Sequence, residues 1–263
     1  MTEPSVIRLA VAGATGRTGR CVLELASHDE RFEIAAALTK PECQTIGSTV
    51  GVGDRAVVVS EILDTTCDVL IDFTVADGTM AWLEVCRERR IPMVIGATGH
   101  SDHQLSQIKE AAGAIPILKA TNFSVGIQAI LNIVGRMAKE LGERYDLEIV
   151  ETHHRHKVDA PSGTALTLVE QIAAATGRTA TDDVVFGRHG QVGRRPTGQI
   201  GVHAVRMGEL VGCHEIHFSG PGETVTVRHT AHSRDTFAAG ALRAAAWIVG
   251  KPPGLYAMRD AVA

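Results

Sequence analysis

Residues 6–19 read VIRLAVAGATGRTG, a short apolar run followed by three glycines at three-residue spacing. We expect a buried strand that ends at Ala12, a tight turn at Gly13 and a helix that begins near Arg17. The pattern is GxxGxxG rather than GxGxxG, but the physics is the same, because glycines let the backbone approach a pyrophosphate at a helix N-terminus. The stretch therefore predicts a dinucleotide-binding fold. A strand-to-helix turn whose glycines serve geometry alone is the alternative.

The rest of the first half alternates short apolar runs with helical patterns. Further strands are expected at residues 32–38, 57–59, 69–73, 92–95 and 115–118, and helices at 17–28, 78–90 and 101–112. Ser101 is a suitable N-cap for the last of these helices. Fully apolar strands between helices indicate a parallel sheet that is covered on both faces. The fold class expected here is α/β, a Rossmann-like doubly wound sheet.

The pattern changes after Asn122. Helices are expected at residues 125–143 and 162–176, and strands at 147–150, 202–206, 214–218 and 224–229. The last three strands alternate apolar and polar residues, and the turns at Gly208 and at residues 220–222 favour antiparallel neighbours. We expect a second, α+β domain over residues 125–233, after a dinucleotide-binding domain over 1–124. The closing segment 234–263, with its Ala-rich helix at 234–249, could return to the first domain.

Composition narrows the possible functions. The chain has 263 residues, 44% of them hydrophobic, and a net charge of -4, so we expect a folded protein without a nucleic-acid partner. No run of 18 apolar residues and no signal-peptide pattern is present, so we expect no membrane span and a cytoplasmic location. The five cysteines show no CxxC spacing, which argues against disulfides and thiolate zinc sites.

The end of the second expected strand bears on cofactor choice. A carboxylate there usually binds the ribose hydroxyls of NAD, but this chain has Thr39 and Lys40. Lys40 and Arg17 could instead meet a 2′-phosphate. We expect the chain to use both NADPH and NADH, with NADPH at least as good.

Residues 151–165, ETHHRHKVDAPSGTA, carry the most informative polar pattern. Histidine titrates near neutral pH and can transfer a proton. The backbone N–H groups of Gly163 and Thr164 lie at an expected helix N-terminus, which attracts carboxylates. The set would suit a small dicarboxylate. Two alternatives are a solvated basic loop and a metal site formed by His153, His154 and His156, although the spacing lacks a carboxylate partner.

This segment resembles the signature of the dihydrodipicolinate reductase family, whose members are 4-hydroxy-tetrahydrodipicolinate reductases. Further segments agree in order along nearly the whole chain. They are residues 13–18, Asp72-Phe73-Thr74, Gly96-Ala97-Thr98-Gly99, residues 120–126 (ATNFSVG) and the ending Gly254-Leu255-Tyr256. The family often has Glu-Arg where this chain has Thr39-Lys40.

The resemblance implies an enzyme of lysine biosynthesis through diaminopimelate, which reduces a cyclic imine dicarboxylate with NADH or NADPH and forms homotetramers through its substrate domain. It implies that His153 is a proton donor and acceptor, that Lys157 is a proton donor, and that His154, Gly163 and Thr164 bind substrate. The residues implied for cofactor binding are Gly13, Ala14, Thr15, Gly16, Arg17, Thr18, Gly96, Ala97, Thr98, Ala120, Thr121, Asn122 and Phe123, beside Thr39 and Lys40. No metal is implied.

Two other functions share parts of this pattern. Another two-domain dehydrogenase of amino-acid metabolism would keep the glycine loop but needs a different substrate segment. A nucleotide-sensing protein without catalysis would have no use for a His/Lys cluster beside a helix N-terminus.

Overall fold

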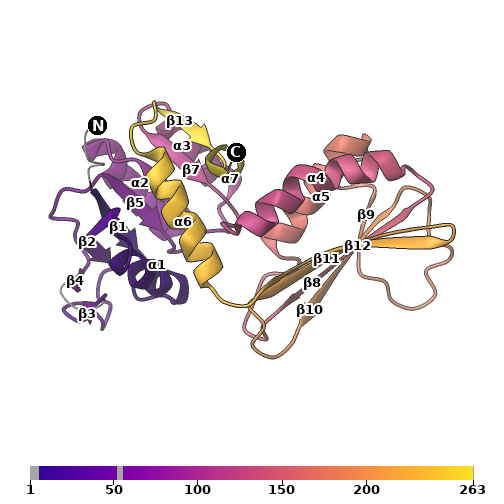
Figure 1. Ribbon diagram of the computed structural model, residues 1–263, viewed down its shortest axis with the longest axis horizontal. Helices are drawn as coiled ribbons and strands as arrows, with labels where there is room; N and C mark the ends of the chain where they lie inside the picture. Colours follow the sequence, from indigo (N-terminus) through magenta and orange to yellow (C-terminus); the bar gives the residue numbers. More distant parts are fainter. Residues whose placement is uncertain (1–5, 52–55, 263) are drawn as a thin grey trace. The chain divides into compact units, whose positions relative to one another are not determined.

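The computed structural model describes residues 6–51 and 56–262 (Figure 1). These residues divide into two compact units. The first unit extends to Ser124 and resumes at Arg234, and the second unit is Val125–Ser233. The second unit is thus an insertion in the chain of the first.

An eight-stranded sheet forms the centre of the first unit, in the order β13-β7-β6-β5-β1-β2-β4-β3. Its strands are β1 (Ile7–Ala12), β2 (Phe32–Leu38), β3 (Thr49–Val50), β4 (Val57–Ser60), β5 (Val69–Asp72), β6 (Met93–Ile95), β7 (Pro116–Lys119) and β13 (Gly254–Tyr256). All neighbouring pairs are parallel except β3 and β4. The predicted parallel sheet is confirmed, while β3 and β13 were not expected from the sequence.

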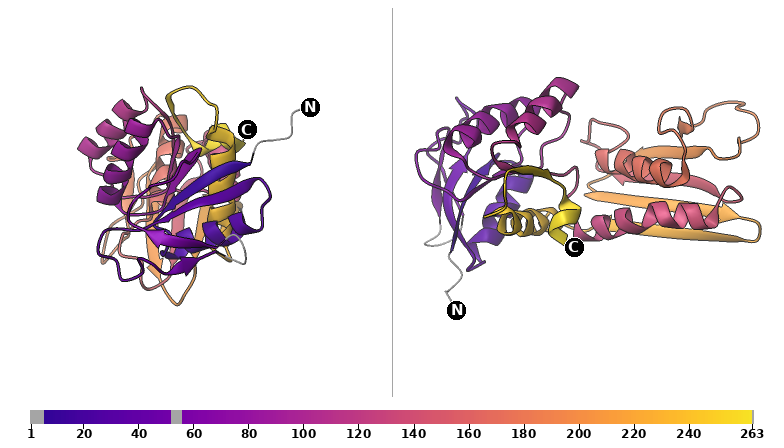
Figure 2. Two further views of the ribbon diagram at one scale, coloured as in Figure 1. Left: turned by 90° about the vertical axis from the view of Figure 1, so that its left-hand side faces the viewer. Right: turned by 90° about the horizontal axis from the view of Figure 1, so that it is seen from above.

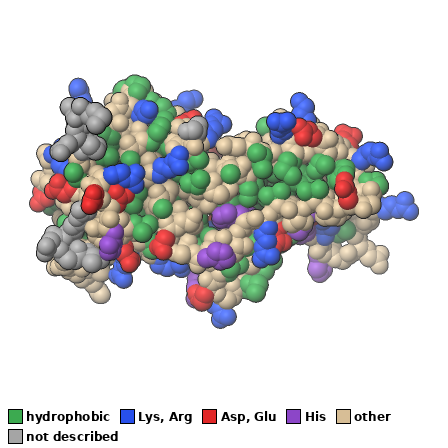
Figure 3. All heavy atoms as spheres, viewed as in Figure 1, with side chains coloured by type: hydrophobic (Ala, Val, Ile, Leu, Met, Phe, Trp, Pro, Cys, Tyr) green, Lys and Arg blue, Asp and Glu red, His purple; other side chains and the backbone are tan. Residues whose placement is uncertain are grey.

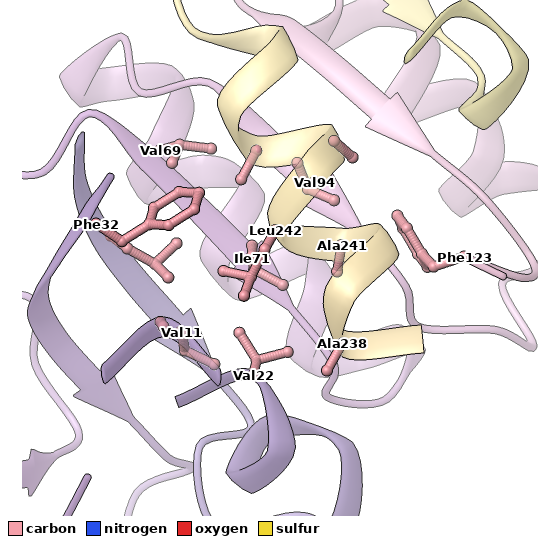
Figure 4. Packing of buried hydrophobic residues seen from close by; sticks show 14 of the residues in the cluster. Val11, Val22, Phe32, Val69, Ile71, Val94, Phe123, Ala238, Ala241 and Leu242 are labelled. Atoms are coloured by element: carbon pink, nitrogen blue, oxygen red, sulfur yellow. The ribbon is translucent and has the colours of Figure 1, made fainter. Parts of the chain in front are cut away.

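Helices cover both faces of this sheet. They are α1 (Arg17–Ser27), α2 (Ala76–Arg89), α3 (Asp102–Ala111), α6 (Asp235–Ile248) and α7 (Met258–Val262). One apolar cluster joins α1 and α6 to one face (Figure 4), and another joins α2 and α3 to the opposite face, as the left view of Figure 2 shows. Ser101 is the N-cap of α3, as predicted, and forms a capping box with Gln104.

Helix α6 packs closely against the segment that follows β7. A Cβ atom at Gly240 would overlap the carbonyl oxygen of Phe123. Ala238, Ala241 and Leu242 of the same helix are fully or almost fully buried in the cluster that Figure 4 shows. Small side chains therefore allow this helix to lie against the backbone, and the C-terminal segment is part of the first unit.

The second unit is a five-stranded sheet with two helices on one face. The sheet has the order β12-β11-β8-β10-β9. Its elements are α4 (Val125–Leu141), β8 (Asp146–His153), α5 (Gly163–Thr176), β9 (Val184–Phe186), β10 (Ile200–Arg206), β11 (Gly212–Gly220) and β12 (Glu223–Ala231). Side chains of α4 and α5 meet alternate residues of β8, β10 and β11 in one apolar cluster. Val125 and Ile133 of α4 stay exposed. Figure 3 shows further hydrophobic side chains on the surface of this unit.

One expected strand pairing is wrong. The turn at Gly208 does not join antiparallel neighbours, because β8 lies between β10 and β11. Strand β10 pairs with β8 in parallel, and β11 pairs with β8 in the antiparallel sense. The turn at residues 220–222 does join antiparallel neighbours, β11 and β12. The residues of a turn indicate that the chain reverses direction, but they do not indicate whether the two strands that it connects are neighbours in the sheet.

Candidate functional site

The glycine loop lies at the carboxyl end of β1. The N–H groups of Gly13 and Ala14 both donate to the carbonyl oxygen of Leu38, at 3.0 Å each, which fixes the loop to the end of β2. Gly13 has a φ of 78°, and a Cβ there would lie 2.6 Å from the carbonyl oxygen of Phe73. A Cβ at Gly19 would overlap the carbonyl oxygen of Gly13. These two positions therefore require glycine, because the backbone packs closely against itself there.

The N-terminus of α1 suits an anion. Gly16 is its N-cap and supplies no side-chain cap, and no acidic residue lies in the first turn. The leading N–H groups of a helix have no partner within the helix, and the helix dipole adds positive potential there. In the sheet order, β1 lies between β2 and β5, so the chain direction along the sheet reverses at this loop. Such a switch point is where open parallel sheets bind nucleotides.

A pocket of about 450 Å³ opens beside this loop. It is lined by Gly13, Thr15, Thr39, Lys40, Pro41, Cys43, Glu61, Thr74, Val75, Gly78, Ala81, Trp82 and Val85. Four predicted cofactor residues, at positions 13, 15, 39 and 40, thus share one pocket. An apolar wall, a glycine turn and one ammonium group fit the adenosine end of a dinucleotide.

The other predicted cofactor segments lie at the same edge of the sheet but do not line this pocket. Residues 96–98 follow β6 and residues 120–123 follow β7, and both strands are parallel to β5. The ring of Phe73, after β5, contacts the ring of Phe123 edge-to-face with centroids 5.6 Å apart. A Cβ at Gly96 would overlap the Phe73 ring. Arg17 is exposed at the helix start and is not among the residues lining the pocket.

Asp72, at the end of β5, stabilises the following turn. It is fully buried and accepts hydrogen bonds from the backbone and hydroxyl of Thr74, at 2.8 and 2.5 Å, and from the hydroxyl of Thr79 at 2.5 Å. Burial raises the pKa of its carboxyl group, against the effect of these hydrogen bonds. Thr74 and Thr79 belong to the turn and the first turn of α2, which indicates a structural role for Asp72.

The histidine segment starts at the end of β8 and is organised around Glu151. This carboxylate is fully buried. It accepts a hydrogen bond from Nδ1 of His153 at 2.6 Å and from the backbone N–H of Ser162 at 3.0 Å. One carboxylate therefore joins the strand end that carries His153 to the residue that caps α5.

Arg206, at the end of β10, completes this network. Its two terminal nitrogens each donate to one oxygen of Glu151, at 2.8 Å, and one of them also donates to the carbonyl oxygen of Asp159 at 2.6 Å. Burial opposes the ionisation of Glu151, but the hydrogen bonds from His153 and Arg206 prevail and lower its pKa to about 2. Glu151 is thus an anion at neutral pH, and it can only accept hydrogen bonds. The proton of the bond with His153 therefore lies on Nδ1, which leaves Nε2 for a ligand.

His214 lies beside this network on β11, directly opposite Glu151 in the sheet register. Its Nε2 and the hydroxyl of Ser162 are 3.0 Å apart, and its ring contacts that of His153 edge-to-face with centroids 5.2 Å apart. Burial, and then the nearby His153, lower its pKa to about 3. His214 is therefore neutral and supports the helix cap rather than adding a charge.

The remaining predicted substrate residues lie on the loop after β8 and at the start of α5. Lys157 donates to both carboxylate oxygens of Asp159, at 2.8 Å each, and Asp159 is fixed through its carbonyl group to Arg206. His154 is buried, with 8% of its surface exposed. Gly163 and Thr164 are the first residues of α5, whose first turn holds no acidic residue. Ser162 caps this helix by accepting from the backbone N–H of Ala165 at 3.2 Å.

Four residues of these sites were missed by sequence reasoning: Glu151 as the central acceptor, Arg206, His214 and, in the pocket of the first unit, Glu61. Glu151, Arg206 and His214 share one face of the sheet, because they continue the alternation of the apolar residues Ile149, Val202 and Ile216. The signal in the sequence is a polar residue at the end of a strand, at a position where the alternation would place a buried apolar residue. Glu61 could have been found as the residue directly after the strand at 57–60.

Two further findings bear on the possible ligands. Across residues 6–51 and 56–262, His, Cys, Asp and Glu side chains nowhere gather in a group of three or more that could hold a metal ion. No helix in the same residues has both the length and the apolar character needed to cross a bilayer.

The chain matches known proteins over nearly its whole length. Residues 7–123 match the family described as dihydrodipicolinate reductase, N-terminus, and residues 126–262 match dihydrodipicolinate reductase, C-terminus. The chain is 41% identical to a 4-hydroxy-tetrahydrodipicolinate reductase of Myxococcus xanthus, with 97% of each chain covered. It is 43% identical to that of Acinetobacter baumannii, over 96% of this chain and 95% of the relative.

A solved structure agrees with these relatives. The dipicolinate-bound dihydrodipicolinate reductase from Paenisporosarcina sp. TG-14 superposes with a TM-score of 0.74 at 25% identity, over 96% of this chain and 98% of that one. Family matches in both halves, relatives above 40% identity and a site built on the predicted histidine segment all lead to one assignment. The chain belongs to the dihydrodipicolinate reductase family.

Proposed function

We propose that this chain reduces 4-hydroxy-tetrahydrodipicolinate to tetrahydrodipicolinate with NADH or NADPH and with loss of water, in lysine biosynthesis through diaminopimelate. Relatives of the same name, above 40% identity over nearly the full length, support this proposal. The structural observation that carries it is the Glu151 network, which joins His153, the Lys157 loop and the N-terminus of α5 through one buried carboxylate.

The reaction adds one hydride and one proton to the ring and releases one water molecule. When bound, the reduced nicotinamide supplies the hydride. In the glycine loop, backbone N–H groups at the start of α1 bind the pyrophosphate, and the pocket beside Lys40 holds the adenosine end. The N–H groups at Gly163 and Thr164 bind a substrate carboxylate, with His154 beside them on the preceding loop.

Proton transfer falls to His153 and Lys157. Because Glu151 holds the proton on Nδ1 of His153, the Nε2 atom of this ring accepts or donates a proton toward the substrate. The ammonium group of Lys157 is held by Asp159, whose carboxyl pKa is lowered. Burial opposes this shift, but the hydrogen bond and charge of Lys157, together with the charge of Arg206, outweigh it. A substrate anion that reaches Lys157 must therefore compete with Asp159 for its ammonium group.

The assay that tests this function follows the loss of nicotinamide absorbance when enzymatically generated substrate is added. We expect oxidation of NADH and NADPH only in the presence of that substrate. Oxidation with another imine or keto acid, but not with this substrate, would assign the chain to a different dehydrogenase activity.

We further propose that the chain acts in the cytoplasm as a homotetramer assembled through the second unit. Five unpaired cysteines are typical of a reducing compartment. One face of the second sheet carries no helix among the described residues, because α4 and α5 both pack on the other face. Charges on this open face are already paired: Glu148 accepts from Arg188, Arg195 and His203. Such a face can be buried without leaving an unpaired charge.

Sedimentation velocity tests this assembly. Val205 is 36% exposed and lies on the open face, two residues from His203. We expect Val205→Arg to shift the tetramer to smaller species, whereas Leu166→Arg, at a similarly exposed position of α5, should leave it intact. A wild-type monomer, or a tetramer unaffected by Val205→Arg, would contradict this interface.

A further inference from the structure

The carboxyl ends of β2 and β4 lie side by side in the first unit. The two strands are parallel, with Leu38 opposite Ser60, and the N–H of Thr39 donates to the carbonyl oxygen of Ser60 at 2.9 Å. Residues after β2 and residues after β4 therefore leave the sheet at the same edge, next to the glycine loop. Both segments line the 450 Å³ pocket described above.

The residue after β2, which usually is the acid that binds the ribose, is not acidic in this chain. Thr39 follows β2, has no carboxylate and is buried, with 5% of its surface exposed. The sequence therefore shows no carboxylate at the end of β2 and leaves open a glutamate from elsewhere in the chain. In the structure, Glu61, the residue after β4, lines the same pocket as Lys40 and Gly13.

Glu61 is held in this position by the turn that follows Lys40. The backbone N–H of Glu42 donates to Oε2 of Glu61 at 3.3 Å. Glu42 has a φ of 58°, so the chain turns sharply there. Within the described part of the chain, Oε1 of Glu61 has no hydrogen-bond donor, which leaves it available to a ligand. The pocket thus presents one carboxylate and one ammonium group to the same end of a dinucleotide.

We propose that Glu61 and Lys40 are the opposed determinants of cofactor choice, with Glu61 accepting the ribose hydroxyls of NADH and Lys40 binding the 2′-phosphate of NADPH. This assignment rests on the proposed reductase function and names the residues that set its cofactor specificity. A carboxylate beside the ribose accepts hydrogen bonds from two hydroxyls but repels a phosphate at the same place. The ammonium group has the opposite preference, so the pair leaves both cofactors able to bind.

The test compares dissociation constants for NADH and NADPH, measured by nicotinamide fluorescence without substrate. We expect the wild-type dissociation constants for NADH and NADPH to differ by no more than about tenfold. The reason is that Glu61 and Lys40 each contribute the free energy of about one hydrogen bond to a charged group, in favour of opposite cofactors. Glu61→Gln should shift the ratio about tenfold or more toward NADPH, and Lys40→Gln should shift it toward NADH. The matched control is Glu30→Gln, an equal change of charge just before β2, at the opposite edge of the sheet.

The outcomes separate this proposal from the proposed function. If Glu61→Gln binds both cofactors with the wild-type ratio, Glu61 is not the ribose acceptor, whether or not the enzyme is active. If wild type binds neither cofactor, the reductase function itself is contradicted. Glu61, Lys40 and Glu30 are all exposed, so we expect unchanged unfolding temperatures in all three variants.

Discussion

Glu151 and His153, two residues apart on β8, project from the same face of the sheet and share a 2.6 Å hydrogen bond. The carboxylate end of this pair is fully buried, whereas 12% of the His153 side chain is exposed. The pair therefore has an anchored end and an end that can meet a ligand, as expected for an imidazole oriented by a carboxylate behind it.

Replacing Glu151 by Gln should damage both stability and turnover. Arg206 would lose its counter-charge in a mostly buried site, which typically costs about 3–5 kcal/mol. The pKa of Glu151 is lowered in the folded chain, so its stabilisation is present above the ordinary carboxyl pKa and is lost as the pH falls toward about 2. Thermal unfolding at neutral pH would measure the effect on stability, and the pH dependence of turnover would measure the effect on activity. Glu209→Gln, at an exposed carboxylate near His156, is the control and should change little. A stable, fully active Glu151→Gln protein would refute the organising role.

Removal of either proton-transfer group should reduce turnover. General acid–base catalysis contributes about 10²–10⁴-fold, so His153→Ala and Lys157→Ala should each lose activity on that scale. Cofactor binding should persist, since both residues belong to the second unit and the dinucleotide pocket to the first. His156→Ala, a change at a neighbouring exposed histidine, should retain near-normal turnover. Normal turnover of either of the first two variants would remove that residue from the mechanism.

A side chain at the start of α5 should weaken substrate binding. Gly163→Val places a branched side chain beside the N–H groups proposed to hold a carboxylate, so the Michaelis constant for substrate should rise far more than the dissociation constant of NADPH. Ala174→Val, at an exposed position near the other end of the helix, should affect neither. Pyridine-2,6-dicarboxylate, a planar analogue, should compete with the substrate. Equal damage to both constants in Gly163→Val would indicate misfolding instead.

Cys43 should react with iodoacetamide faster than the other cysteines. Hydrogen bonds from Thr39 and Thr45, with the charge of Lys40, lower the pKa of its thiol to about 7. Burial instead raises the pKa of Cys67 to about 11. The alkylation rate should therefore rise through a midpoint near pH 7, and NADPH in the pocket should slow it. Mass mapping of the alkylated peptides shows which cysteine reacts first, and Cys43→Ser is the control. If another cysteine is modified first, this prediction is wrong.

Local sequence patterns predicted the helices and the longer strands well. Strand β2 has the predicted bounds, and Ser101 caps α3 as expected, because periodicity and capping depend on residues close in sequence. Strands β3, β9 and β13 have only two or three residues, too few to show a period. The pairing of β10 with β8 could not be predicted, since it depends on contacts between residues about 50 positions apart.

In the candidate sites too, features set by residues close in sequence could be predicted, and features set by strand pairing could not. His153, Lys157 and Gly163 could be predicted together because they belong to one continuous motif. Arg206 and His214 reach Glu151 only through the register of three strands, and Glu61 reaches the cofactor pocket only because β4 pairs with β2. The sequence marks each of these residues as lying at the end of a strand, but which of them meet in one site depends on how the strands pair.

The insertion of the second unit has a consequence for folding during synthesis. The sheet that starts with β1 is completed by β13, which pairs with β7, and its face is closed by α6. Domains generally fold in the order in which they leave the ribosome. Here the first unit cannot complete its fold until the last thirty residues, about a tenth of the chain, have been synthesised. All residues of the inserted unit are synthesised before them. A chain released without the residues from Arg234 onward would therefore have a complete inserted unit and a nucleotide-binding unit whose apolar face is still open to chaperones.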